Sequence, residues 1–134
     1  MRVRPMKVLL VEDSTLLRGV LCETINNLKN LSVEGMATTQ KKAISLLNEI
    51  QFDILLLDIE LSEGNGFEVI KHIKKPNYPF KLPILMVLTN HANQHYRAMA
   101  KNLSVHYFFD KSMDFDFAIE AIEFEAELFY KKPN

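Results

Sequence analysis

Ile54-Leu55-Leu56-Leu57-Asp58 is the stretch that decides the fold, because four consecutive apolar residues end directly in a carboxylate. A run this short and this uniformly apolar is typical of a strand buried on both faces, as in a parallel sheet. A charged residue directly after such a strand lies at the edge of the sheet, where it can meet a ligand. Asp58 is therefore the first candidate functional residue.

Three further apolar runs end in polar residues of the same kind. Residues 8–11 precede Glu12 and Asp13, residues 84–88 precede Thr89, and residues 107–109 lead through Asp110 to Lys111. The carboxyl ends of parallel strands meet at one edge of a sheet. The sequence therefore predicts that carboxylates, a hydroxyl and an ammonium group gather there.

Segments with helical periodicity alternate with these runs, which predicts βαβ units and an α/β fold. We expect a doubly wound, five-stranded parallel sheet with five helices, of the flavodoxin-like (βα)5 type. Ser14 or Asp13 can cap a first helix that Asn30 ends. Strand two, around residues 32–37, is expected near an edge, and residues 74–81 form the longest loop before Pro83 opens strand four.

The last helix carries an unusually wide apolar stripe. Its core side contains Ala118, Ala121, Ile122 and Phe129, and three more apolar residues, Phe117, Phe124 and Leu128, lie beside them. We interpret the aromatic residues mainly as core, with weak homodimerisation or a partner surface as the alternative.

Length and composition fit one soluble domain, residues 1–134, with a core from about residue 6 to residue 129. The chain is 48% hydrophobic and 25% charged, and its formal net charge is −1. That charge balance gives no broad attraction to nucleic acid or to anionic membranes. The single cysteine, Cys22, excludes an internal disulfide, and no apolar run reaches the length of a membrane span or a signal peptide, so we expect a cytoplasmic protein.

The order of these residues resembles the receiver domain of two-component response regulators, from about Met6 to about Phe129. The likeness rests on their joint occurrence, together with Asp58-Ile59-Glu60-Leu61 and the downstream Gly66-Phe67-Glu68. The resemblance implies a stand-alone response regulator. Asp58 would then attack a phosphohistidine on a sensor histidine kinase or a histidine phosphotransfer protein and become an acyl phosphate.

Three carboxylates at one edge repel one another, and either a shared proton or a divalent cation compensates them. We favour Mg²⁺, because the site is expected to be partly open to water. Asp13 and Asp58 would bind it directly, a backbone carbonyl of Glu60 would join them, and Glu12 would act from the outer sphere. Magnesium and Lys111 would supply the positive charge that brings a carboxylate and a phosphoryl group together.

The resemblance also implies a conformational switch. Thr89 would donate its hydroxyl to the phosphoryl group, and Phe108, three positions before Lys111, would change rotamer in response. Output to a downstream partner that the sequence does not identify would use helix four, strand five and helix five. The kinase would dock on helix one near Leu16.

Several positions depart from the commonest family pattern. Ser62 stands where proline is frequent, which predicts a looser loop. Asn90 is larger than the usual residue after Thr89, and Ser112 replaces a proline after Lys111, so a cis peptide is not assumed there. By resemblance, Glu60 and His91 would tune how long the phosphoryl group lasts.

Four other functions are weighed against this one. A receiver-like scaffold without phosphorylation would keep the fold. An aspartyl-phosphate phosphatase of the haloacid-dehalogenase type carries its nucleophilic aspartate after the first strand, whereas Asp58 follows the third. In a flavodoxin-like binder, Glu12 and Asp13 would repel the phosphate of the flavin. His91 and His95 have the spacing of two ligands on one helical face, but no further zinc ligand lies near them in sequence.

Overall fold

The sheet of this protein contains five parallel strands in the order β2-β1-β3-β4-β5. A computed structural model describes residues 4–131. The strands are β1 (Met6–Val11), β2 (Leu31–Ala37), β3 (Ile54–Leu57), β4 (Ile84–Thr89) and β5 (Tyr107–Asp110). The helices are α1 (Thr15–Asn26), α2 (Gln40–Glu49), α3 (Gly66–Ile73), α4 (Gln94–Asn102) and α5 (Phe115–Lys131). The expected doubly wound five-stranded fold is confirmed.

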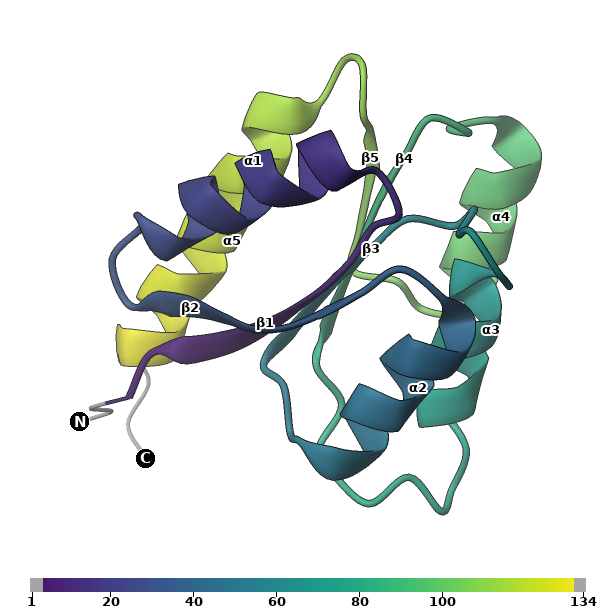
Figure 1. The fold of residues 1–134 in the computed structure, drawn as a ribbon, viewed down its shortest axis with the longest axis horizontal. Coiled ribbons are helices and arrows are strands. Elements are labelled where there is room, and N and C mark those ends of the chain that lie inside the picture. The colour runs from purple at the N-terminus through teal and green to yellow at the C-terminus, as the bar shows by residue number, and fades with distance from the viewer. Residues whose placement is uncertain (1–3, 132–134) are drawn as a thin grey trace.

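Helices cover both faces of the sheet, with α1 and α5 on one face and α2, α3 and α4 on the other (Figure 1). The strands supply side chains to the two cores alternately, as the twofold period of a strand requires. In β3, Leu55 and Leu57 pack under α2, α3 and α4, while Ile54 and Leu56 pack under α1 and α5. This double burial explains why β3 is an unbroken apolar run.

Each of the first four helices begins at a polar side chain that accepts a hydrogen bond from the first turn. Ser14 rather than Asp13 caps α1, and its hydroxyl accepts from Leu17 N at 3.3 Å. The end of this helix was predicted wrongly. It ends at Asn26, and Asn30 lies in the following turn with a left-handed φ of 66°. Asparagine tolerates that conformation in a turn as well as at a helix end, which is why the sequence misled.

Strand β2 lies at the edge of the sheet, as predicted, and β5 forms the opposite edge. The register of β2 against β1 shifts after Val8, so that Leu9 pairs with Gly35 and Glu34 is passed over. The predicted long loop is also present, since residues 74–83 connect α3 to β4. Tyr78 attaches this connection to α2 by donating its hydroxyl to Leu47 O at 3.0 Å.

The wide stripe of α5 divides into a buried and an exposed part. Ala118, Ile122 and Ala126 are buried. Phe117 and Phe124 are 61% and 53% exposed, so the prediction that they belong to the core is wrong. Residues 117 and 124 are two turns apart on one side of the helix, while the buried residues lie on another.

Gly66 explains why α3 can start directly beside the end of β3. A Cβ at this position would lie 2.3 Å from Asp58 O and 3.0 Å from Ile59 Cα. The amide of Gly66 donates to Ile59 O at 2.7 Å, which fixes the loop that follows Asp58. We predict that Gly66→Ala lowers the free energy of unfolding by about 2–3 kcal/mol in urea denaturation, because backbone atoms must shift.

Gly19→Ala is the matched control for this substitution. Nothing lies within 4 Å of a Cβ at residue 19 inside α1, so alanine there should stabilise the protein by about 0.5–1 kcal/mol. A Gly66→Ala variant as stable as the wild type would contradict the close packing of α3 on the β3 end.

Candidate phosphoacceptor site

Three carboxylates meet at the carboxyl ends of β1 and β3. One oxygen from each of Glu12, Asp13 and Asp58 lies within 4.8 Å of the others. Glu12 and Asp58 are only 2% and 5% exposed, whereas Asp13 is open to solvent. Their proximity follows from the sheet, since β1 and β3 are direct neighbours with Val11 paired to Leu57.

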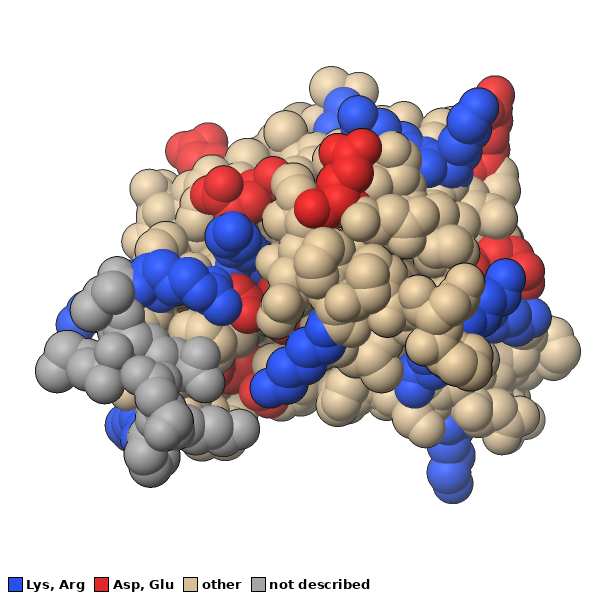
Figure 2. Space-filling model, turned by 90° about the horizontal axis from the view of Figure 1, so that it is seen from below, with Lys and Arg blue, Asp and Glu red and all other residues tan. Residues whose placement is uncertain are grey.

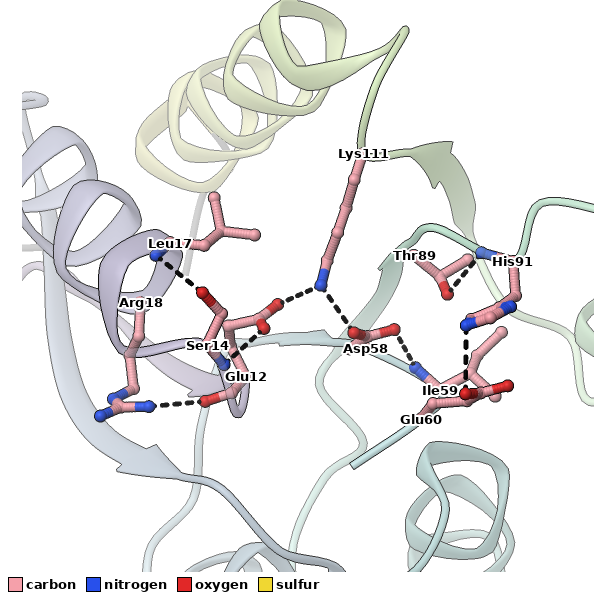
Figure 3. Close-up of polar contacts among 10 residues, drawn as sticks. All are labelled: Glu12, Ser14, Leu17, Arg18, Asp58, Ile59, Glu60, Thr89, His91 and Lys111. Atoms are coloured by element: carbon pink, nitrogen blue, oxygen red, sulfur yellow. Dashed lines mark hydrogen bonds and ion pairs between the residues drawn. The ribbon is translucent and has the colours of Figure 1, made fainter. Parts of the chain in front are cut away.

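Lys111 reaches into this cluster from the end of β5. Its Nζ lies 2.6 Å from Asp58 Oδ2 and 2.8 Å from Glu12 Oε1, and its side chain is 11% exposed (Figure 3). The sequence predicted that a proton or a cation compensates the carboxylates. In the structure, part of the negative charge is compensated by the protein itself, because the ammonium group of Lys111 bridges Glu12 and Asp58.

Burial and pairing act in opposite directions on these groups. Desolvation by burial raises the pKa of Glu12, although hydrogen bonds from Lys111 and from the amide of Ser14 oppose the rise. Desolvation would lower the pKa of Lys111, but its hydrogen bonds to Asp58 and Glu12 outweigh this effect and the pKa is raised. Lys111 is therefore a permanent cation at neutral pH.

Backbone amides hold the two buried carboxylates in place. Asp58 Oδ1 accepts from Ile59 N at 2.7 Å, and Glu12 Oε2 accepts from Ser14 N at 2.9 Å. Sequence reasoning missed Arg18, whose guanidinium donates to Glu12 O at 2.9 Å from the second turn of α1. No motif signalled this contact, because it depends on how α1 is oriented over the end of β1.

Thr89 ends β4 beside β3 and is fully buried. Its Oγ1 accepts a hydrogen bond from His91 N at 3.1 Å, and its carbonyl accepts one from Lys111 N at 2.9 Å. Figure 3 shows Thr89 at the end of the site opposite to Glu12, with Asp58 between them. The hydroxyl keeps its own hydrogen free to donate to a group that arrives on Asp58.

Glu60 and His91 connect the loops that follow β3 and β4. His91 Nε2 lies 3.1 Å from Glu60 Oε1, and Tyr96 OH lies 3.4 Å from Glu60 Oε2. The expectation that His91 and His95 share a helical face is wrong, because α4 begins only at Gln94. Among residues 4–131, the three-carboxylate cluster is the one group of at least three such side chains placed to hold a metal, and it includes neither histidine.

Phe108 is half-buried in β5 and packs against the core under α2, α3 and α4. The guanidinium of Arg97 lies 4.8 Å from the centre of its ring, at a distance typical of a cation–π contact. Sequence reasoning identified Phe108 but missed Arg97. A charged residue on a polar helix gives no sign of the ring beneath it.

The departures from the family pattern have local structural consequences. Ser62 donates its hydroxyl to Thr38 O at 2.9 Å, so the side chain that replaces proline anchors the loop rather than loosening it. Ser112 donates from its amide and its hydroxyl to Asp110 Oδ1 at 2.8 and 2.7 Å, after a trans peptide. Asn90 is exposed.

Comparison with known proteins agrees with this geometry. The family model described as "Response regulator receiver domain" matches residues 8–129. The chain belongs to this family. As a receiver domain it is 34% identical over 91 residues to protein-glutamate methylesterase/protein-glutamine glutaminase 2 of Vibrio vulnificus, which covers 68% of this chain and 26% of that protein. It is 36% identical over 84 residues to the corresponding enzyme of Pyrococcus horikoshii, covering 63% and 22%. The chain thus spans about a quarter of these curated relatives.

Solved structures show the same fold. The response regulator domain of Thermotoga maritima CheB superposes with a TM-score of 0.77 at 22% identity, covering 97% of this chain and all of that one (100%). The phosphorylated cyanobacterial phytochrome response regulator RcpA gives 0.77 at 22% identity, with 97% of each chain covered. The receiver domain of NarL from Mycobacterium tuberculosis gives 0.80 at 18% identity, covering 93% and 98%.

The carboxylate cluster of this receiver domain fits the divalent cation that its family binds. Carboxylate oxygens are the hard ligands that Mg²⁺ prefers, and the exposed Asp13 offers a side from which a hydrated ion can approach. Lys111 takes one oxygen of Glu12 and one of Asp58. Asp13 is therefore the carboxylate most available to a metal.

Glu12→Gln tests how the cluster divides its charge. We predict about tenfold weaker Mg²⁺ binding by titration calorimetry, because an outer-sphere anion is lost. Without Mg²⁺, the free energy of unfolding at pH 7 should rise by about 1 kcal/mol, because an amide needs no desolvated charge at this buried position. The sign follows from the raised pKa of Glu12, since stability from such a group is complete below its ordinary value of 4.5 and is lost as the pH rises through the folded pKa.

Glu23→Gln provides the control, since this glutamate is exposed on α1 away from the cluster. It should change neither quantity. Unchanged Mg²⁺ affinity in Glu12→Gln would contradict a metal site at this cluster.

Proposed function

We propose that this receiver domain accepts a phosphoryl group on Asp58 from a phosphohistidine and thereby switches its affinity for a protein partner. The observation that carries the proposal is the contact of Lys111 Nζ with Asp58 Oδ2 at 2.6 Å inside a buried acidic cluster. An acceptor carboxylate and an incoming phosphoryl group are both negative, so a fixed cation beside the acceptor removes much of their repulsion.

The transfer step uses groups that are already in position. An oxygen of Asp58 forms a bond to phosphorus while the phosphorus–nitrogen bond of the donor histidine breaks, and the electron pair of that bond stays on the imidazole. Lys111 moves from the carboxylate to an oxygen of the arriving group. Asp13, Asp58 and the Glu60 carbonyl would hold Mg²⁺, with Glu12 in the outer sphere, and the ion would supply further positive charge there.

The switch follows from the hydroxyl of Thr89. Its hydrogen turns toward a phosphoryl oxygen on Asp58, and the β4–α4 loop follows because Thr89 Oγ1 also accepts from His91 N. Phe108 then repacks against the core and loses its present contact with Arg97. The surface made by α4, β5 and α5 carries the output, and α5 contributes the exposed apolar side chains of Phe117 and Phe124.

The donor is a sensor histidine kinase or a histidine phosphotransfer protein. Leu16 and Met113 are 80% and 77% exposed. Leu16 lies in the first turn of α1, just after Glu12 and Asp13, and Met113 lies in the β5–α5 connection that begins with Lys111. Apolar residues so exposed favour contact with a protein partner. The lifetime of the phosphoryl group depends on Glu60 and His91, which together cover the loops around Asp58.

The proposal also covers where the domain acts and which chemistry it performs. The receiver domain acts in the cytoplasm, and its chemistry is limited to gaining and losing its own phosphoryl group. Within residues 4–131, no helix has the length and apolar character that crossing a membrane requires. Figure 2 shows acidic and basic groups mixed on one face, which gives nucleic acid no extended positive surface there.

The direct test is phosphorylation with phosphoramidate and Mg²⁺, followed by intact mass spectrometry. The wild type should gain the mass of one phosphoryl group, and Asp58→Asn should gain none. Asp116→Asn, an exposed aspartate on α5, should behave as the wild type. A phosphoryl adduct that persists in Asp58→Asn, or no adduct on the wild type after rapid quenching, would contradict the proposal.

A further inference from the structure

A cavity lies at the amino ends of the strands, at the opposite end of the sheet from Asp58. Its volume is about 570 Å³, within the range of small-molecule sites. It is lined by residues at the amino ends of strands, such as Met6, Ile84 and His106, and by Leu128 and Phe129 of α5. Its other wall is the α3–β4 connection, which contributes Lys74 and residues 81–83. The receiver chemistry proposed above uses none of these groups.

The acidic groups of this cavity are already paired. Arg4 contacts both oxygens of Asp53, at 2.7 and 3.1 Å, and Lys7 N donates to Asp53 Oδ2 at 2.8 Å. Tyr107 OH donates to Glu125 Oε2 at 2.6 Å. Asp53 is thus neutralised by Arg4, whereas Glu125 accepts from a neutral hydroxyl and keeps its negative charge.

The basic groups contributed by the long connection are not paired in this way. Lys74 and Lys81 both line the cavity, and neither forms an ion pair with a carboxylate of residues 4–131. The lining holds three basic side chains, Arg4, Lys74 and Lys81, against two carboxylates, Asp53 and Glu125, so one positive charge is in surplus. An anion beside Lys74 or Lys81 would meet complementary charge without displacing an existing ion-pair partner.

His106 adds a directed donor to these charges. Its Nδ1 accepts a hydrogen bond from Leu85 N at 2.9 Å, so the neutral ring carries its proton on Nε2. The tautomer is therefore fixed by the backbone of β4. Ser104 lines the same wall and adds a hydroxyl.

The remaining walls are apolar, which limits the kind of anion that fits. Phe52, Ile84 and Leu128 line the cavity, and Leu82 also lines it while remaining 44% exposed. Inorganic ions gain nothing from such surface, whereas an aromatic or branched carboxylate can bury its body there and direct its charge to the lysines. The ten-residue connection 74–83 is the longest between elements of residues 4–131, and ligand-binding loops are often long.

We propose that this cavity binds a small organic anion with an apolar body, with Lys74 and Lys81 holding the charge. The occupied cavity would join the α3–β4 connection to α5, and so couple a small molecule to the helix that forms part of the output surface. The cavity is separate from the phosphoacceptor site, since no residue of the acidic cluster lines it.

The proposal is tested by two-dimensional amide NMR titration of the full chain with 2-naphthoate. Saturable shifts should centre on residues 81–85 and 104–106, with a Kd of about 0.1–1 mM. 2-Naphthalenemethanol lacks the negative charge, and inorganic phosphate lacks the apolar body. Each should bind at least about tenfold more weakly than 2-naphthoate. Equal binding of either probe would overturn the proposed ligand class.

Two variants distinguish binding in the cavity from non-specific binding to surface lysines. Lys74→Ala combined with Lys81→Ala should weaken 2-naphthoate binding by about tenfold or more. Lys75→Ala removes one positive charge from the same connection at a residue that does not line the cavity, so the affinity of this variant should equal that of the wild type. Non-saturating shifts spread over surface lysines, or equal losses in both variants with unchanged circular dichroism, would show that no such site exists.

Discussion

The ammonium group of Lys111 is the interaction on which the rest of the site depends. Glu12 and Asp58 are buried almost completely at the end of a parallel sheet, where uncompensated charge is costly. Lys111 lies within 2.8 Å of both, and it reaches them only because β5 ends on the same edge of the sheet as β1 and β3. The cluster is consequently stable enough to exist and still anionic enough to attract a divalent cation.

The fold contributes to this site mainly through what surrounds the strand ends. The hydroxyl of Ser14 caps α1, and its backbone amide donates a hydrogen bond to the carboxylate of Glu12. The same residue therefore begins the helix and orients a side chain of the site. Gly66 allows α3 to start against the backbone of Asp58. The loop between Asp58 and Gly66 is hydrogen-bonded to the start of α2, where Gln40 N donates to Glu63 O at 3.0 Å. These contacts limit the movement of the acceptor and leave the β4–α4 loop as the part able to respond.

The sheet, and the meeting of Glu12, Asp13, Asp58 and Lys111 at one end of it, could be predicted because both depend on local pattern. Apolar runs such as residues 54–57 have few structural alternatives, and the residues after them must share an edge once the strands are parallel. The errors arose where tertiary contacts decide. Asn30 suited both a helix end and a turn, Phe117 and Phe124 matched a core stripe but face outward, and Arg97 and Arg18 gained their roles from neighbours distant in sequence.

If Lys111 and the acidic cluster together make Asp58 a phosphate carrier, the arrival of the phosphoryl group should move Thr89 and Phe108. The decisive measurement is a crystal structure of the protein with Mg²⁺ and beryllium trifluoride, a mimic of the phosphoryl group. We expect the mimic on Asp58, with Lys111 and the Thr89 hydroxyl on its fluorine atoms and Phe108 turned away from Arg97. A mimic bound elsewhere, or one bound to Asp58 while Lys111 keeps its contacts with Glu12 and Asp58 and Thr89 stays in place, would contradict the account.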